Sequence, residues 1–376
     1  MTSNVNATVG ARIASLRKAR RLTQDQLATM VGVEHGQIVS SIEHGQRSLK
    51  VSELSRFASA LCVPFLSLLP VDPLPEQPRV RWRQVRDEDA RALDEALFVD
   101  RCRRYAFVER VTGTTPARDL RSFPLDIAST SYEHASSWAE RVRGELRLGE
   151  LPAPALRDTL ESTVGIKVFV TPLKGGSGAA TNGAYGMAVL VNKDEPPDRQ
   201  AYSLAHELFH LLTWASLPPD ATALAPEMEK RNEQLADAFA SALLLPAEPL
   251  LQRLGAEPVE GRRLIVLERL ARDFGVSLPA LVYRLVNLGR LHKDVAQKIL
   301  DAPDRWRTRP GSGESGIPDF PSRYVALAFT AYVDGEISIG KLAELLETTV
   351  GMLPRTLLAY GFDPDTDAYE TQVLSA

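Results

Sequence analysis

The spacing of hydrophobic and polar residues predicts a chain built mainly of helices. Apolar positions at helical spacing predict helices over residues 132–147, 154–164, 199–214, 227–245, 264–288 and 322–362, the last broken at Asp334–Gly335. Two segments instead show the β-branched residues and periodicity of strands, Gly165–Thr171 and Met187–Asn192, and a glycine-rich loop, 175–183, lies between them. We therefore expect an α+β fold that is mainly α with a small β-sheet.

Two segments rich in proline interrupt this pattern. Residues 70–78 cannot continue a helix and predict a stiff boundary, and Ala302–Pro321 predicts a second, looser linker. Residues 80–125 are strongly charged and predict a helical connecting arm. The expected organisation is an all-α unit over 1–70, a linker and helical arm over 71–130, a mixed unit over 131–301, and a linker with a C-terminal helical region over 302–376.

Composition adds a charge asymmetry to this picture. The 376 residues are 44% hydrophobic and 24% charged, as in soluble globular proteins, and carry a net charge of −4. Residues 1–70 hold eight cationic side chains against four anionic ones, a net +4, so the remainder carries −8. This asymmetry favours one module that meets phosphate and another that does not.

Cysteine content and hydropathy point to a reducing compartment. The two cysteines, Cys62 and Cys102, give no disulfide framework and no cysteine-based zinc site. No apolar run is long enough to span a bilayer, and the N-terminal residues show no signal-peptide pattern. We therefore expect a cytoplasmic protein with no membrane partner.

Chemistry concentrates in the predicted helix that contains His206, Glu207 and His210. The two histidines are four residues apart, so both imidazoles project from one side of the helix and can reach one zinc ion. Glu207 adjoins a ligand and can take the proton of a metal-bound water. The surrounding helix is apolar, where two imidazoles without partners would be costly. A helix with two surface histidines is the alternative interpretation.

A second, acidic helix offers the missing ligand. Glu233 and Asp237 share one face of this helix with Ala240 and Leu244. A zinc ion held by two histidines needs a third ligand and an open water position, and Glu233 can supply the ligand. Asp237, one turn later, can accept the outer N–H of a ligating histidine. The alternative third ligands are Glu227 and Glu229, which lie in the more exposed start of the helix.

Arg199–His210 and Glu233–Pro246 together resemble the ImmA/IrrE family of metallopeptidases, and Gly176–Ala179 and the strand ending at Asn192 fit that family's layout. The resemblance covers about residues 130–290. It implies a small thermolysin-like fold, with zinc bound by His206, His210 and Glu233, and with Glu207 as the catalytic base. It also implies a substrate class, because characterised relatives cleave helix-turn-helix repressors to release genes of stress or mobile-element responses.

Residues 10–69 resemble the lambda-repressor-like (Xre) helix-turn-helix domains. The resemblance rests on Ile13–Arg20, Leu22–Ala28, Val31–Val33 and Ile42–Gly45, and it implies a second helix over about 24–31 and a recognition helix over about 35–43 that enters the major groove of duplex DNA. The expected DNA-contacting residues, on bases or phosphates, are Gln24, Gln37, Ser40, Ser41, Arg47 and Lys50. A protein-interaction or dimerisation module is the alternative, and a homodimer is compatible with either interpretation.

The recognition helix departs from the family pattern. Ile38 occupies one expected inward position, but Ile42 comes one residue too late, as if one residue were inserted. Val39 with Ile42 would restore the inward pair. Gly36 at the start of the helix is a further departure.

The leading functional hypothesis is a DNA-binding regulatory zinc metallopeptidase that hydrolyses a peptide bond in a helix-turn-helix repressor. The substrate would bind by strand addition beside Met187–Asn192. The alternative is a transcription regulator whose metallopeptidase-like domain is a non-hydrolytic metal or ligand sensor. An intact Glu207 weighs against a purely structural metal site, which needs no base.

Overall fold

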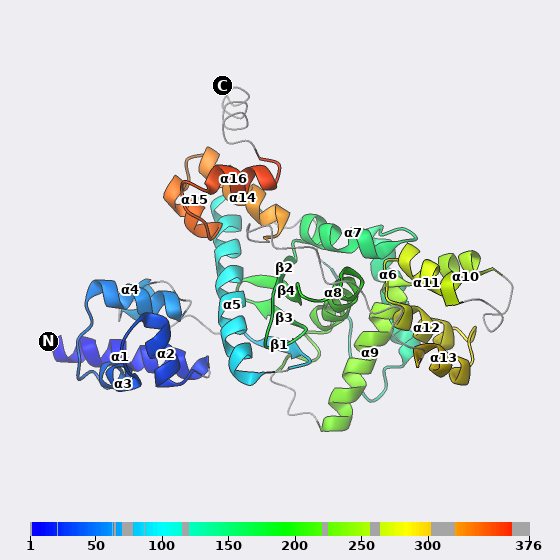
Figure 1. The fold of residues 1–376 in the computed structure, drawn as a ribbon, viewed down its shortest axis with the longest axis horizontal. Coiled ribbons are helices and arrows are strands. Elements are labelled where there is room, and N and C mark those ends of the chain that lie inside the picture. Colours follow the sequence, from blue (N-terminus) through cyan, green and yellow to red (C-terminus); the bar gives the residue numbers. More distant parts are fainter. Residues whose placement is uncertain are drawn as a thin grey trace.

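The computed structural model describes residues 2–20, 22–61, 63, 65–69, 78–85, 87–114, 120–219, 225–255, 264–301 and 320–362. The proline-rich segment 70–78 and the linker 302–321 lie almost wholly outside these ranges, as does Cys62. Figure 1 shows an N-terminal helical unit beside the long helix α5 (Glu88–Val111), which borders a small sheet, with further helices on the other side of that sheet. The expected fold class, mainly α with a small β-sheet, is confirmed.

The N-terminal unit has its own hydrophobic core. Its elements are α1 (Thr2–Ala19), α2 (Gln24–Val31), α3 (Gly36–Glu43), α4 (Val51–Ala60) and a short 3-10 helix, η1 (Phe65–Leu68). The Thr23 side chain caps α2 and the left-handed Gly32 ends it, so the predicted bounds of this helix are confirmed. Val39 and Ile42 are 0% and 2% exposed, which confirms them as the inward pair of α3.

Gly36 has a steric role at the start of α3. Its backbone N–H donates to Asp25 Oδ1 of α2 at 2.9 Å, and a Cβ at this position would lie 2.3 Å from the same oxygen. A side chain would therefore push the two helices of the motif apart, which explains why glycine occupies a helix start.

Four strands form the sheet, in the order β1-β3-β4-β2. They are β1 (Val80–Arg83), β2 (Lys167–Thr171), β3 (Gly178–Gly183) and β4 (Gly186–Asn192). Strand β2 pairs with β4 in parallel, whereas β3 runs antiparallel to both β4 and β1. The two strands predicted from the sequence are confirmed as β2 and β4.

Two predictions about this region were wrong. The glycine-rich segment 175–183 is not only a loop, because β3 occupies most of it, and the first residues of the predicted helical arm form β1 instead. Small residues suit β3 because helix α8 (Pro197–Leu212) packs directly on this strand. A Cβ at Gly178 would lie 3.7 Å from Oε1 of Glu207 in that helix.

Helices cover both faces of the sheet, and each face contributes to a separate core. Valines of β2 and β4 pack with helices α6 (Tyr132–Leu146), α7 (Pro152–Thr159), its π-helical extension η2 (Leu160–Val164), α8 and α9 (Pro226–Leu244). The opposite face, with Phe169 and Leu190, packs against α5 and the C-terminal helices α14 (Ser322–Val333), α15 (Ile339–Leu345) and α16 (Leu353–Ala359). The predicted break at Asp334–Gly335 is confirmed, but the part that follows it is two helices, α15 and α16, and not one.

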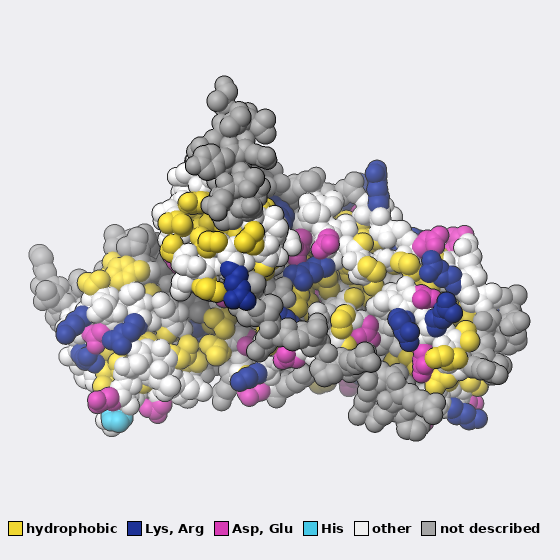
Figure 2. Space-filling view, turned by 45° about the horizontal axis from the view of Figure 1, so that its top comes forward, with side chains coloured by type: hydrophobic (Ala, Val, Ile, Leu, Met, Phe, Trp, Pro, Cys, Tyr) yellow, Lys and Arg dark blue, Asp and Glu magenta, His cyan; other side chains and the backbone are white. Residues whose placement is uncertain are grey.

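Four more helices extend the first core, α10 (Ala247–Leu254), α11 (Leu264–Asp273), α12 (Leu278–Asn287) and α13 (Lys293–Leu300). The predicted single helix over 264–288 is two helices, because Gly275 adopts a φ of +67° and Ser277 caps α12. Figure 2 shows hydrophobic side chains gathered over the C-terminal helices, where Ile339, Met352 and Leu358 are exposed. Among the described helices, none is long and apolar enough to cross a membrane.

Candidate functional site

Helix α8 carries three buried polar side chains of one motif. The helix starts at Pro197, a residue suited to a first turn, and packs against β3 and β4. His206, Glu207 and His210 are 1%, 1% and 4% exposed. The histidines lie one turn apart on one side of the helix, and their Nε2 atoms are 3.2 Å apart.

Helix α9 brings Glu233 to the same point. Glu233 Oε2 lies 3.1 Å from His206 Nε2, and Oε1 lies 3.4 Å from His210 Nε2. The donor atoms of His206, His210 and Glu233, here named the His–Glu cluster, all lie within 4.8 Å of one another. Asp237 Oδ1 lies 2.9 Å from His206 Nδ1, the outer nitrogen of that ring. The two imidazoles and the Glu233 carboxylate form a donor set that fits zinc, and the Asp237 carboxylate supports the His206 ring from behind.

The alternative third ligands lie elsewhere. Glu227 is exposed at the start of α9. Glu229 forms an ion pair with Arg81 and is not part of the cluster.

Glu207 is a buried carboxylate without a hydrogen-bond partner among the described residues. Both of its carboxylate oxygens are inaccessible and unpartnered. Burial raises the pKa of Glu207 to about 7, although the charges of His206 and Arg83 act in the opposite direction. Such an orphaned group is costly to a fold and is typical of a functional site.

The electrostatics of the His–Glu cluster favour one anionic and one neutral donor. Burial, helped by the charge of Arg81, lowers the pKa of His210 to about 3, so this ring is neutral near pH 7. Burial opposes the ionisation of Glu233, but its hydrogen bonds with both histidines outweigh burial and lower the pKa of Glu233. For His206, burial lowers the pKa and the hydrogen bonds to Asp237 and Glu233 raise it, with a net rise. A metal ion at this cluster therefore competes with a proton for His206.

Two arginines of β1 reach the same site, and sequence reasoning missed both. Arg81 pairs with Glu229 and, at 3.0 Å, with Glu233 Oε1. Arg83 donates to Ser203 Oγ at 2.8 Å and lies 3.9 Å from Asp237 Oδ1. The available signal was their spacing of two, which places both side chains on one face of a strand.

The predicted site of strand addition, beside Met187–Asn192, is wrong. Strand β4 is hydrogen-bonded to β2 on one edge and to β3 on the other, so neither edge is free. The far edge of β3, in turn, is occupied by β1.

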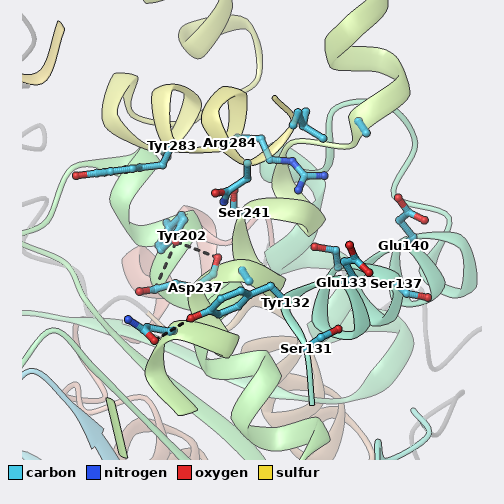
Figure 3. Close-up of a pocket in the computed structure, with 17 residues that line it drawn as sticks. Ser131, Tyr132, Glu133, Ser137, Glu140, Tyr202, Asp237, Ser241, Tyr283 and Arg284 are labelled. Carbon is cyan, nitrogen blue, oxygen red and sulfur yellow. Dashed lines mark hydrogen bonds between the residues drawn. The ribbon is translucent and has the colours of Figure 1, made fainter. Parts of the chain in front are cut away.

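A cavity of about 1150 Å³ lies behind Asp237, between α6, α9 and α12. Figure 3 shows Arg284, Glu140 and Asp237 on different sides of it, and Tyr202 hydrogen-bonded to Asp237. Arg284 is 5% exposed and burial lowers its pKa, and Ser241 Oγ is buried without a hydrogen-bond partner. Arg284 Nε already donates to the Leu245 carbonyl at 3.0 Å, so the unpartnered Ser241 Oγ is the group that makes the cavity a candidate ligand site.

The candidate DNA-contacting residues differ in their surroundings. Gln37 and Lys50 are exposed, whereas Ser40 and Ser41 are half-buried, with Ser41 Oγ donating to the Gln37 carbonyl at 2.9 Å. The other two residues contact carboxylates of their own unit: Gln24 donates to Glu43 at 2.9 Å, and Arg47 to Glu53 at 2.8 Å.

The fold and the clustered side chains define the class of the protein, a helix-turn-helix domain joined to a metallopeptidase-like domain. Residues 13–68 match the sequence model of the helix-turn-helix family, and residues 161–286 match that of the IrrE N-terminal-like domain, peptidase family M78. The chain therefore joins a helix-turn-helix domain to a domain of the IrrE N-terminal-like family, as the sequence predicted.

Solved structures of other proteins also show similarity to the chain. A Mycobacterium tuberculosis transcriptional regulator is similar over 55% of this chain and 54% of that chain, with 20% identity and a TM-score of 0.31. The present chain thus covers about half of that protein's length. No curated protein sequence matches the chain.

Proposed function

We propose that the chain is a DNA-binding zinc metallopeptidase that hydrolyses a peptide bond in a helix-turn-helix repressor. The observation that supports it most is the convergence of the His–Glu cluster beside the buried, unpartnered carboxylate of Glu207. A purely structural metal site gains nothing from such a carboxylate, whereas a hydrolytic site needs a base there.

Each residue has a role in this proposal. The His–Glu cluster would hold zinc, which when bound polarises the scissile carbonyl and acidifies an attacking water. Asp237 holds the His206 ring through its outer nitrogen. Glu207 takes a proton from the attacking water and returns it to the leaving amine. Without metal, burial raises the pKa of Glu207 to about 7, within the range of groups that accept and release a proton near neutral pH.

The choice of a repressor as substrate rests on the family resemblance and on the helix-turn-helix domain of the chain itself. That domain would bring the peptidase to operators where such repressors are bound, which raises their local concentration. Binding to phosphates is favoured by the net charge of +4 over residues 1–70.

Glu207→Gln tests the hydrolytic step. The variant keeps the shape and hydrogen-bonding capacity of the side chain but cannot accept a proton, so it should retain zinc and lose cleavage of a co-expressed repressor from a neighbouring gene. Glu227→Gln makes the same charge change on an exposed side chain and should cleave normally. Undiminished cleavage by Glu207→Gln would remove Glu207 from the mechanism.

The cavity behind Asp237 favours a second candidate, a domain that senses a small ligand without hydrolysis. Arg284 could meet an anionic group there, and Tyr202 and Asp237 would relay occupancy to His206 through their hydrogen bonds. Cells carrying Glu207→Gln separate the two candidates. Unchanged regulation in these cells, together with its loss in Arg284→Met, would favour the sensor.

A further inference from the structure

Strand β1 lies along the edge of β3 that runs beside the His–Glu cluster. It pairs antiparallel with β3 from Val80 opposite Thr181 to Arg83 opposite Gly178. Gly178 is also the residue of β3 that lies against Glu207. The main-chain groups of β3 nearest the proposed base therefore already have a strand partner.

An extended peptide binds to a protein most simply by adding a strand to a free sheet edge. Strand β4 has no free edge, so β3 offers the edge closest to Glu207, and a peptide added there would occupy the place of β1. β1 belongs to neither family match, because it lies between residues 13–68 and residues 161–286. The segment that connects the two domains thus supplies the strand.

The side chains of β1 alternate between the two faces of the sheet. Trp82 turns to the far face of the sheet, where its Nε1 donates to Glu95 of α5 at 2.7 Å. Arg81 and Arg83 turn to the near face and are 8% and 10% exposed. Their partners there are acidic or polar groups of α8 and α9, including Glu233 of the cluster itself.

Buried arginines are costly unless partners compensate their charge, and at this edge carboxylates supply that compensation. The near face of this edge is therefore a binding surface for cationic side chains at alternate positions of an extended strand. Arg81 also competes with a metal ion for the carboxylate of Glu233, so pairing of β1 and loading of the cluster are linked.

From this geometry we infer that β1 is an internal occupant of the substrate position. It keeps the site closed, and the segment that replaces it is an extended peptide with basic side chains at alternate positions. This inference rests on the proposed function for the identity of the site, but peptide binding can be measured whether or not the chain hydrolyses anything.

The test uses a fluorescent peptide with the sequence of residues 78–85 and the full chain in the Glu207→Gln background, so that hydrolysis plays no part. Anisotropy should show at least about tenfold tighter binding to Arg81→Gln/Arg83→Gln than to the chain with both arginines, because the internal strand has lost its ion pairs. The control, Arg101→Gln/Arg103→Gln, removes two arginines of α5 that pair with Glu347 and Asp100. This variant should bind the peptide as weakly as the chain that keeps Arg81 and Arg83.

A second variant tells whether tighter peptide binding comes from release of β1 or from a disturbed fold. Val80→Cys/Thr181→Cys places a cysteine pair at facing positions of β1 and β3. In the Arg81→Gln/Arg83→Gln background, the oxidised pair should abolish peptide binding and reduction should restore it. Equal peptide affinity with and without the two arginines, or binding that is insensitive to the crosslink, would overturn the inference. Peptide binding without cleavage by the chain carrying Glu207 would instead contradict only the proposed hydrolysis.

Discussion

The buried carboxylate of Glu207 should impose a pH-dependent cost on the metal-free fold, and Glu207→Gln should remove it. In the unfolded chain this group ionises near its ordinary pKa of 4.5, whereas burial raises the pKa to about 7 in the fold. Between these values the folded chain binds more protons than the unfolded one, so its stability falls as pH rises. Below pH 4.5 the side chain is neutral in both states and imposes no electrostatic cost.

The size of the effect follows from the two pKa values. The interval from 4.5 to about 7 corresponds to about 3 kcal/mol, at about 1.4 kcal/mol for each pH unit. Because the side chain is 1% exposed, solvent screening reduces this figure little. Glutamine has a similar shape and no charge, so the free energy of unfolding of Glu207→Gln should exceed that of the original chain by about 3 kcal/mol more at pH 8 than at pH 4.5.

Urea unfolding in the presence of a chelator measures this difference. All four tryptophans lie beyond residue 80, so tryptophan fluorescence follows the metallopeptidase-like part without the helix-turn-helix domain. Glu227→Gln is the control, because Glu227 is exposed and its replacement should change stability equally at both pH values. If the stability gap between Glu207→Gln and the original chain were the same at pH 4.5 and pH 8, the carboxylate would not carry the burial cost assigned to it.

Three further outcomes are expected. The purified chain should hold about one zinc ion by elemental analysis, and alanine at any residue of the His–Glu cluster should abolish zinc binding. Asp237→Ala should weaken zinc binding about 10–100-fold. Full zinc retention without Glu233 would point to another ligand. The isolated unit 1–70 should bind duplex DNA with an affinity that falls as salt rises, and Gln37→Ala should reduce discrimination between sequences; salt-independent binding would favour a protein-interaction role. Gly36→Ala should lower the stability of this unit by about 1–3 kcal/mol in thermal denaturation, because its Cβ would clash with Asp25; an unchanged melting temperature would contradict the close approach.

The helix-turn-helix domain and the residues of the His–Glu cluster were predictable because their signals are local. Two histidines four residues apart face the same way in any helix, and a capping Thr23 with a terminal Gly32 marks the ends of α2. Glu233 was harder to predict as a ligand, because its helix had to be assumed to pack on α8. The helix face that Glu233 shares with Asp237 supported this assumption.

Strand β3 was not predictable from propensity. Glycine and alanine are poor strand formers, and a run such as Gly178–Ala180 is more common in loops. These residues form a strand because β1 and β4 pair with them on both sides and α8 packs closely over them. The energy that selects the strand thus comes from tertiary contacts, which a local sequence pattern does not contain.

The position of β1 depends on contacts that are still more distant. Arg81 meets Glu229 and Glu233 at separations of 148 and 152 residues along the chain. The charged sequence of β1 is equally compatible with a solvated helix. Yet Arg81 and Arg83 are almost fully buried, and burial of two guanidinium groups is favourable only because the same site already concentrates carboxylates for another purpose. The chemistry of the cluster therefore determines where the connecting segment packs. The cluster and this segment together define the sheet edge beside Glu207.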